Sequence, residues 1–130
     1  MKKVLVVDDE QDFCYFLKKN LESSGDFEVS ICNESANGIA LIKQVKPDLV
    51  LLDIVMPGIS GSDIAGLMRE DRDLRDIPFA FLTAIIKQDE VVQGQGHVGG
   101  ETFIAKPVAS DELARIVGEC IARKKEGAHA

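Results

Sequence analysis

The chain lacks long apolar runs, tryptophan and any excess of positive charge. Its 130 residues contain no Trp and one Tyr, and aromatic residues make up only 5% of the sequence. The longest apolar stretches are about five residues, far short of the ~20 that a membrane helix needs. The formal net charge of −7 argues against sequence-independent binding to nucleic acid, which requires Lys and Arg to neutralise phosphates, and against attraction to an anionic membrane.

Cysteine is scarce and shows no pattern of its own. Cys14, Cys32 and Cys120 are an odd number without metal-type spacing, and each falls within a periodic apolar pattern. We therefore expect reduced core or near-core residues in a cytoplasmic protein rather than a disulfide framework. The start of the chain agrees, because Met1 and two lysines lead into only four apolar residues before acids follow, which is not a secretory signal.

Short apolar runs alternate with stretches of helical period along the whole chain. With 45% hydrophobic and 28% charged residues, the composition is that of an ordinary globular protein, and the length suits one domain. The alternation is typical of strands and helices that build a parallel sheet covered on both faces. We expect an α/β fold of five strands and five helices over residues 1–122, followed by a polar tail over 123–130.

The apolar runs differ in a way that predicts their place in the sheet. Residues 4–7, 49–52 and 79–82 are almost continuously apolar, as strands buried on both sides should be. Residues 27–31 alternate apolar and polar, and the run 102–105 is short. We expect the first three runs at the centre of the sheet and the last two at its edges.

Four stretches carry an apolar stripe of helical spacing. The stripes are Phe13, Phe16, Leu17 and Leu21; Ala36, Ile39, Ala40 and Val45; Ile64, Leu67 and Met68; and Leu113, Ile116, Val117, Cys120 and Ile121, the last after a capping Ser110. The remaining helix is expected after Thr83, where Gly94 and Gly96 would fall in its later turns. Each internal glycine costs about 1 kcal/mol against alanine, so we expect that helix to be short or frayed.

Carboxylates follow two of the predicted central strands. Asp8 and Asp9 come directly after the run 4–7, and Asp53 comes directly after the run 49–52. The crevice of an open parallel sheet lies outside the carboxyl ends of its strands, so these acids should share one small pocket. Like charges that close repel each other, and a hard cation with oxygen ligands relieves the repulsion, Mg²⁺ being the first choice in a cell. Such a pocket suits phosphate chemistry.

Four motifs in this order resemble the receiver domain of two-component response regulators, the CheY-like superfamily, over nearly the whole chain. They are Asp8-Asp9 after the first strand, Asp53 in LVLLDIVMPGISG, Thr83 after FAFL, and Lys106-Pro107 in FIAKP. The resemblance implies a flavodoxin-like, doubly wound parallel sheet of strand order 2-1-3-4-5. It also implies a site at the switch point between the first and third strands.

The resemblance implies a role for each residue of the acidic pocket. Asp53 is the phosphoacceptor, whose carboxylate attacks phosphorus and becomes an acyl phosphate. Asp9, Asp53 and the backbone carbonyl of Val55 bind Mg²⁺ directly, and Asp8 acts mainly through a bound water. A carboxylate is a poor nucleophile toward an anionic phosphoryl group unless the charge on the transferring oxygens is neutralised, which is why the metal is needed.

Three further residues complete the expected site. Lys106 supplies a second positive charge, Thr83 donates its hydroxyl to the phosphoryl group once it is present, and Phe103 matches the position of the family's switch aromatic. The residues next to the attacking water, two after the acceptor and two after the threonine, are Val55 and Ile85. Neither can orient water by hydrogen bonding, so we expect slow self-dephosphorylation.

The function implied is a phosphorylation-dependent signalling switch and not an enzyme beyond its own phosphorylation and dephosphorylation. The phosphoryl donor is a sensor histidine kinase or a histidine phosphotransfer protein. The phosphorylated form changes its affinity for a downstream protein target or output domain, and the resemblance allows a phosphorylation-dependent homodimer. No direct nucleic-acid or membrane partner is expected.

Other functions of the same fold fit the sequence less well. A flavin-binding flavodoxin needs a hydroxyl- or glycine-rich phosphate loop, whereas the loop after the first strand is DDEQD. A phosphatase of the haloacid dehalogenase class needs an Asp-x-Asp motif there, and it is absent. The remaining alternative is a degenerate receiver that serves as a phosphorylation-independent docking or dimerisation module. The intact set of Asp53, Thr83 and Lys106 argues against it.

Overall fold

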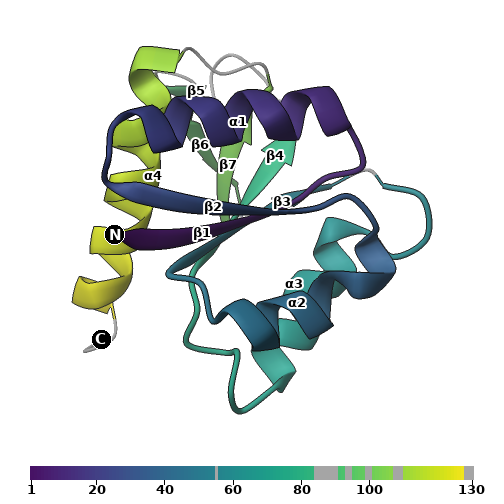
Figure 1. Ribbon diagram of the computed structural model, residues 1–130. Helices are drawn as coiled ribbons and strands as arrows, with labels where there is room; N and C mark the ends of the chain where they lie inside the picture. Colours follow the sequence, from purple (N-terminus) through teal and green to yellow (C-terminus); the bar gives the residue numbers. More distant parts are fainter. Residues whose placement is uncertain (55, 84–90, 93–94, 99–100, 107–109, 128–130) are drawn as a thin grey trace.

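A single sheet with helices on both faces forms the fold (Figure 1). The computed structural model describes all residues except 55, 84–90, 93–94, 99–100, 107–109 and 128–130. The strands are β1 (Lys2–Val7), β2 (Phe27–Cys32), β3 (Leu49–Asp53), β4 (Phe79–Thr83), β5 (Val91–Val92), β6 (Gln95–Val98) and β7 (Glu101–Ala105). The helices are α1 (Gln11–Ser23), the short 3₁₀-helix η1 (Ser35–Asn37), α2 (Gly38–Val45), α3 (Gly61–Glu70) and α4 (Ser110–Gly127).

The parallel part of the sheet has the predicted strand order. The strands run β2-β1-β3-β4-β7, and every neighbouring pair among them is parallel. Because β7 is the fifth of the predicted strands, this is the order 2-1-3-4-5 of a flavodoxin-like sheet, and that prediction is confirmed. Parallel neighbours require crossovers: α1 lies in the connection from β1 to β2, α2 in that from β2 to β3, and α3 in that from β3 to β4.

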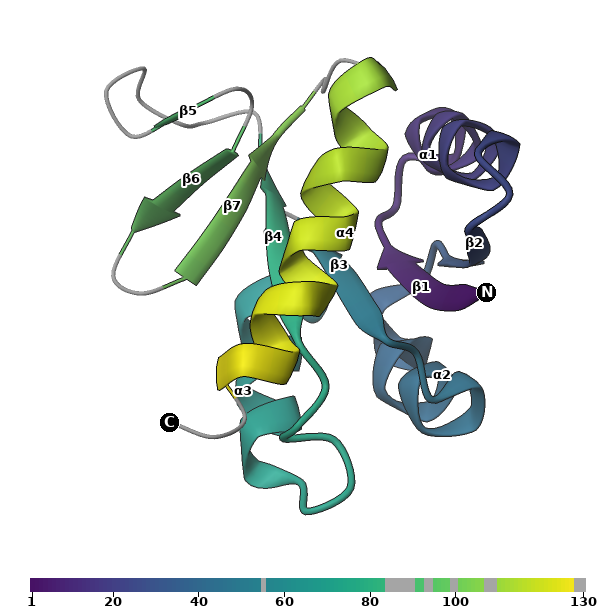
Figure 2. The same ribbon diagram turned by 90° about the vertical axis from the view of Figure 1, so that its left-hand side faces the viewer.

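Beyond β7 the sheet differs from the prediction. β6 pairs antiparallel with β7, and β5 pairs antiparallel with β6, so the run 102–105 is not an edge strand. Figure 2 shows β6 and β5 continuing the sheet on the side away from β1. The described residues of the segment expected to hold a helix after Thr83 are therefore strands, and the described part of the chain has four α-helices, not five. Residues 84–90 of that segment lie outside the described residues.

The composition of this segment explains the difference. Val91, Val92 and Val98 are β-branched and favour strands over helices. The register pairs Val98 with Glu101, so only two residues, both glycine in the sequence, connect β6 to β7. Gly-Gly is among the pairs that suit a two-residue hairpin connection. Gly94 and Gly96 were expected to weaken a helix, and the pair Gly99-Gly100 is a hairpin signal in the sequence.

The sheet separates two apolar cores. Helices α1 and α4 cover one face, and α2 and α3 cover the other (Figure 1). Alternate residues of one strand go to opposite cores: Leu49 and Leu51 pack with α1 and α4, whereas Val50 and Leu52 pack with α2 and α3. A fully buried side chain of this size contributes about 1.5–3 kcal/mol, so both layers hold the central strands in place.

The first helix ends close to a glycine, as helices commonly do, whereas the last helix is longer than predicted. α1 ends at Ser23, and Gly25 has the positive φ of 83° that favours glycine. α4 continues to Gly127, so residues 123–127, expected to be a polar tail, are helical. Within the residues that the structure describes, none of the helices combines the length and the apolar character needed to span a bilayer.

Two side chains of α1 block the outer edge of β2. The backbone N–H of Val29 donates to Glu22 Oε2 at 3.0 Å, and its carbonyl accepts from Lys18 Nζ at 2.8 Å. Lys18 and Glu22 also form an ion pair at 2.9 Å. The hydrogen bond from Val29, with help from Lys18, lowers the pKa of Glu22. An open edge strand is a template for pairing with another chain, and here the backbone groups of Val29, in the middle of the strand, are occupied.

Candidate functional site

Four predicted residues meet at the carboxyl ends of four strands. Asp8 directly follows β1, Asp53 is the last residue of β3, Thr83 is the last residue of β4, and Lys106 directly follows β7. The strands are parallel, so these ends share one edge of the sheet. The register pairs Asp53 with Leu82 and Thr83 with Ala105. The alignment of the strands therefore places the backbones of these site residues next to one another.

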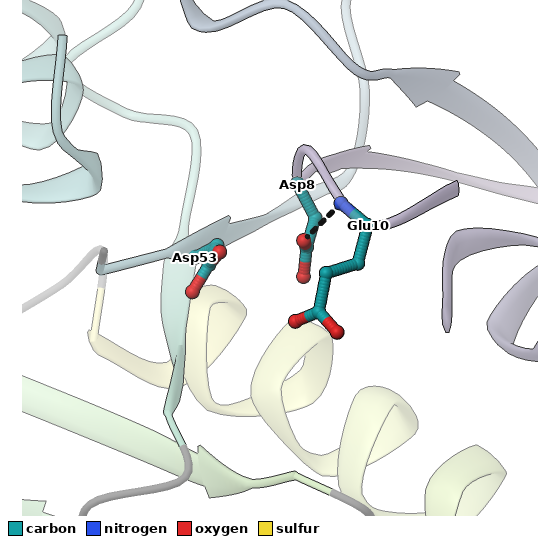
Figure 3. A group of neighbouring side chains, drawn as sticks. All are labelled: Asp8, Glu10 and Asp53. Atoms are coloured by element: carbon teal, nitrogen blue, oxygen red, sulfur yellow. Dashed lines mark hydrogen bonds between the residues drawn. The ribbon is translucent and has the colours of Figure 1, made fainter. Parts of the chain in front are cut away.

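Three carboxylates converge in this pocket. Asp8 is 0% exposed and Asp53 is 5% exposed, and the third acid is Glu10, two residues after Asp8. Each offers a carboxylate oxygen within 4.8 Å of the others. Figure 3 shows the three side chains directed at the same space, with the backbone N–H of Glu10 donating to Asp8 Oδ1 at 2.9 Å. Sequence reasoning did not select Glu10.

Lys106 places its ammonium among these acids. Its Nζ lies 3.0 Å from Asp8 Oδ2 and 3.7 Å from Asp53 Oδ1, and it donates a hydrogen bond to Glu10 Oε1. The ammonium also lies 4.7 Å from the centroid of the Phe13 ring, within the range of a cation–π contact. Burial alone would lower the pKa of Lys106, but its close contacts with the carboxylates of Glu10 and Asp8 outweigh burial and raise the pKa. The ammonium is therefore charged at neutral pH.

The acids fit the predicted Mg²⁺. Asp8 Oδ2 is fully buried and, within the described residues, has an ion pair with Lys106 but no hydrogen bond. A carboxylate oxygen buried in this way requires a positive charge beside it, which Lys106 supplies here and a metal ion would supply when bound. Asp53 and Glu10 supply further oxygens close by, and oxygen ligands of this kind are those that Mg²⁺ prefers.

Asp9 is not a member of this group. Its side chain is exposed and lines a separate hollow of about 230 Å³ with Asn33, Met56 and Pro57. Asp8 and Asp9 thus face different spaces although they are adjacent in the sequence. The direct metal contact expected of Asp9 stays a prediction. Val55, whose carbonyl was expected to bind the ion, lies outside the described residues.

The backbone of Asp8 is held from three directions. Its N–H donates to the Cys32 carbonyl at 3.0 Å, and its carbonyl accepts from Asn33 Nδ2 at 2.9 Å and from Cys14 Sγ at 3.3 Å. Burial, followed by the charge of Asp8, raises the pKa of the Cys14 thiol to about 12. Cys14 is thus a structural donor and not a reactive thiol, which agrees with the expectation of reduced, buried cysteines.

Gly61 is a second residue of the site that sequence reasoning missed. It begins α3, and a Cβ built there would lie 2.2 Å from the carbonyl oxygen of Asp53. Helix α3 can approach the end of β3 this closely only because the side chain is absent. The helix start is fixed by Ser60 and Asp63, which form a reciprocal capping box. In the sequence, a glycine directly after a capping serine is only a weak indication of a close contact. The structure shows that the contact is with the backbone of Asp53.

Thr83 and Lys106 are joined through the backbone. The N–H of Lys106 donates to the Thr83 carbonyl at 3.0 Å, and Thr83 is buried. Phe103, the expected switch aromatic, is half-buried on β7, with its ring centroid 5.4 Å from that of Phe81 on β4. The structure therefore brings Asp8, Asp53, Thr83 and Lys106 to one edge, and their chemical roles stay predictions.

Comparison with known proteins points to one family. The sequence profile described as "Response regulator receiver domain" matches residues 4–118. Protein PilH of Pseudomonas aeruginosa is 32% identical over 122 residues, which cover 94% of this chain and 99% of PilH. Response regulator Rre1 of Synechocystis is 33% identical over 98% of this chain, which spans only 54% of Rre1.

A solved structure shows the same fold. Vibrio cholerae chemotaxis protein CheY4 superposes with a TM-score of 0.77 at 21% identity, covering 92% of this chain and 98% of CheY4. At this identity the likeness concerns the fold alone.

Proposed function

The chain belongs to the response regulator receiver domain family, and on this premise we propose that it is a signalling switch that is phosphorylated on Asp53. Receiver domains take part in two-component signalling, bind Mg²⁺ in an acidic pocket, and carry out little chemistry beyond their own phosphorylation and dephosphorylation. Which partners this chain has, and which of its residues act, belong to the proposal. The observation that carries it is the position of the Lys106 ammonium among Asp8, Glu10 and Asp53.

The proposed reaction is transfer of a phosphoryl group from a phosphohistidine to Asp53. A carboxylate oxygen of Asp53 forms the new O–P bond as the N–P bond of the donor breaks, and the electron pair of that bond stays on the imidazole nitrogen. Bound Mg²⁺ supplies neutralisation of the charge on the transferring oxygens. Asp8, Asp53 and Glu10 are the residues of the described chain that would hold it, with Asp9 and the Val55 carbonyl as the further ligands proposed from sequence.

Lys106 and Thr83 act on the phosphoryl group from the protein side. The ammonium of Lys106 lies close enough to Asp53 to contact an oxygen of a group attached there. Preorganised positive charge that meets developing negative charge is the largest general contribution to such transfers. Thr83 donates a hydrogen bond from its hydroxyl to the phosphoryl group. Phe103 changes its position in response and so alters the surface that partners bind.

The wider assignment follows from the family. We propose a sensor histidine kinase or histidine phosphotransfer protein as donor and a downstream protein or output domain as target, with a homodimer as one assembly of the phosphorylated form. We further propose a cytoplasmic protein whose receiver spans residues 1–122. The chain spans about half the length of Rre1, so any output activity is outside the proposal.

The test is incubation with acetyl phosphate and Mg²⁺, followed by intact mass measurement. We expect the mass of one phosphoryl group to be added to the wild type and to be absent with Asp53→Asn or without Mg²⁺. Asp26→Asn, which changes an exposed acid beside β2, is the matched control and should be phosphorylated like the wild type. Full phosphorylation of Asp53→Asn would refute the acceptor assignment. A wild type that never gains the group would favour the phosphorylation-independent docking module instead.

A further inference from the structure

Glu10 has an unusual position for a residue that is largely exposed. It is the N-cap of α1, its side chain is 61% exposed, and its backbone N–H donates to Asp8 Oδ1. Its carboxylate nevertheless points toward those of Asp8 and Asp53 (Figure 3) and accepts a hydrogen bond from Lys106. The most exposed of the three acids is thus the one that is hydrogen-bonded to Lys106.

The ammonium of Lys106 is shared unequally among the three acids. It contacts Glu10 and lies 3.0 Å from Asp8, but it is 3.7 Å from Asp53, the proposed acceptor. An ammonium has three protons to donate. In this arrangement Glu10 and Asp8 are closer to it than the residue on which the phosphoryl group would appear.

The charges in the pocket set the direction of the effect. Asp8, Asp53 and Glu10 carry three negative charges, and Lys106 carries one positive charge. The carboxylate of Glu10 therefore attracts a divalent cation into the pocket and at the same time repels an anionic phosphoryl donor. An oxygen of the phosphoryl group would have to draw Lys106 away from Glu10.

We propose that Glu10 is a positioning residue that holds the ammonium of Lys106 in the unphosphorylated protein and competes for it with the phosphoryl group on Asp53. This inference rests on the proposed function. It follows that Glu10 favours Mg²⁺ binding and slows phosphorylation once Mg²⁺ is bound. The two effects have opposite signs, so they can be separated by measurement.

The experiment compares the wild type with Glu10→Gln, which removes the charge but keeps the shape of the side chain. Mg²⁺ affinity is measured by calorimetry, and the rate of phosphorylation by acetyl phosphate is measured at saturating Mg²⁺. We expect Mg²⁺ binding to weaken and the saturated rate to rise, each by about two- to fivefold, as for a partly exposed charge pair. A structural role alone would not raise the rate while weakening the binding.

Asp12→Asn is the matched control. Asp12 is an exposed acid two residues from Glu10 in the first turn of α1, and it is not among the described carboxylates within 4.0 Å of the Lys106 ammonium. We expect its saturated rate to equal that of the wild type. An equal rise in Asp12→Asn and Glu10→Gln would overturn the inference in favour of a general charge effect, and so would an unchanged rate in Glu10→Gln. A wild type that is not phosphorylated at all would overturn the proposed function and this inference with it.

Discussion

Two glycines of α3 should respond in opposite directions when each is replaced by alanine. At Gly61 the new Cβ would lie 2.2 Å from the Asp53 carbonyl oxygen, 2.9 Å from the carbonyl carbon and 3.3 Å from Leu52 Cβ. The first two are backbone atoms, which cannot turn aside as a side chain can. At Gly66 a Cβ would meet nothing within 4 Å.

The magnitudes follow from these distances. Overpacking a buried contact costs about 1–3 kcal/mol, whereas alanine in place of an unhindered helical glycine stabilises by up to about 1 kcal/mol. An unfolding entropy of about 2.1 cal/mol/K per residue makes 1 kcal/mol roughly 4 °C in Tm for a chain of this length. We expect Gly61→Ala to lower Tm by about 4–12 °C and Gly66→Ala to raise it by up to about 4 °C.

The same pair tests the position of the acceptor. Moving a reacting group by about 1 Å can cost up to about 10²-fold in rate, so Gly61→Ala should slow phosphorylation of Asp53 by at least about tenfold, while Gly66→Ala should leave the rate unchanged. Tm is measured by circular dichroism and the rate by intact mass against time. If Gly61→Ala proved as stable and as quickly phosphorylated as Gly66→Ala, the close approach of α3 to β3 would not be a constraint.

Three further predictions concern other parts of the chain. Glu22→Gln should lower the free energy of unfolding. Because the folded-state pKa of Glu22 is lowered from 4.5, the loss of stability relative to the wild type should be fully present above pH 4.5 and should shrink as the pH falls below it. Urea unfolding at several pH values would measure this difference. Ser60→Ala removes the capping box of α3 and should cost about 1 kcal/mol, or roughly 4 °C in Tm. Val55→Asn should speed loss of the phosphoryl group, because an amide can orient the attacking water; an unchanged decay rate would contradict this.

The sequence predicted the parallel sheet well because its signals there are redundant. The runs 4–7, 49–52 and 79–82 are apolar without interruption, as only strands between two helical layers can be. The same regularity placed Asp8 and Asp53, since each follows such a run, whereas Thr83 and Lys106 were expected from the resemblance to receiver domains. Where the hydrophobic pattern is strong, both the element and its end residue follow from it.

The parts that could not be predicted depend on contacts between distant segments. Glu10 joins the pocket because Lys106, far along the chain, reaches it, and Gly61 matters because α3 meets the backbone of Asp53. The segment after Thr83 combines weak helical and weak strand signals, so the pairing of β6 with β7 decides the structure of its described residues. The hydrophobic pattern of the sequence does not show which of these distant segments come into contact.

The backbone hydrogen bond between Lys106 and Thr83 has a consequence for insertions and deletions. This bond continues the register of β7 on β4, so the position of the Lys106 ammonium depends on the alignment of these two strands. Loss or gain of one residue within β7 would turn Lys106 to the opposite face of the sheet. Changes of length before Glu101, by contrast, would leave the alignment of β7 with β4 intact. Relatives can therefore be expected to differ in length between Thr83 and β7, but not between Phe103 and Lys106.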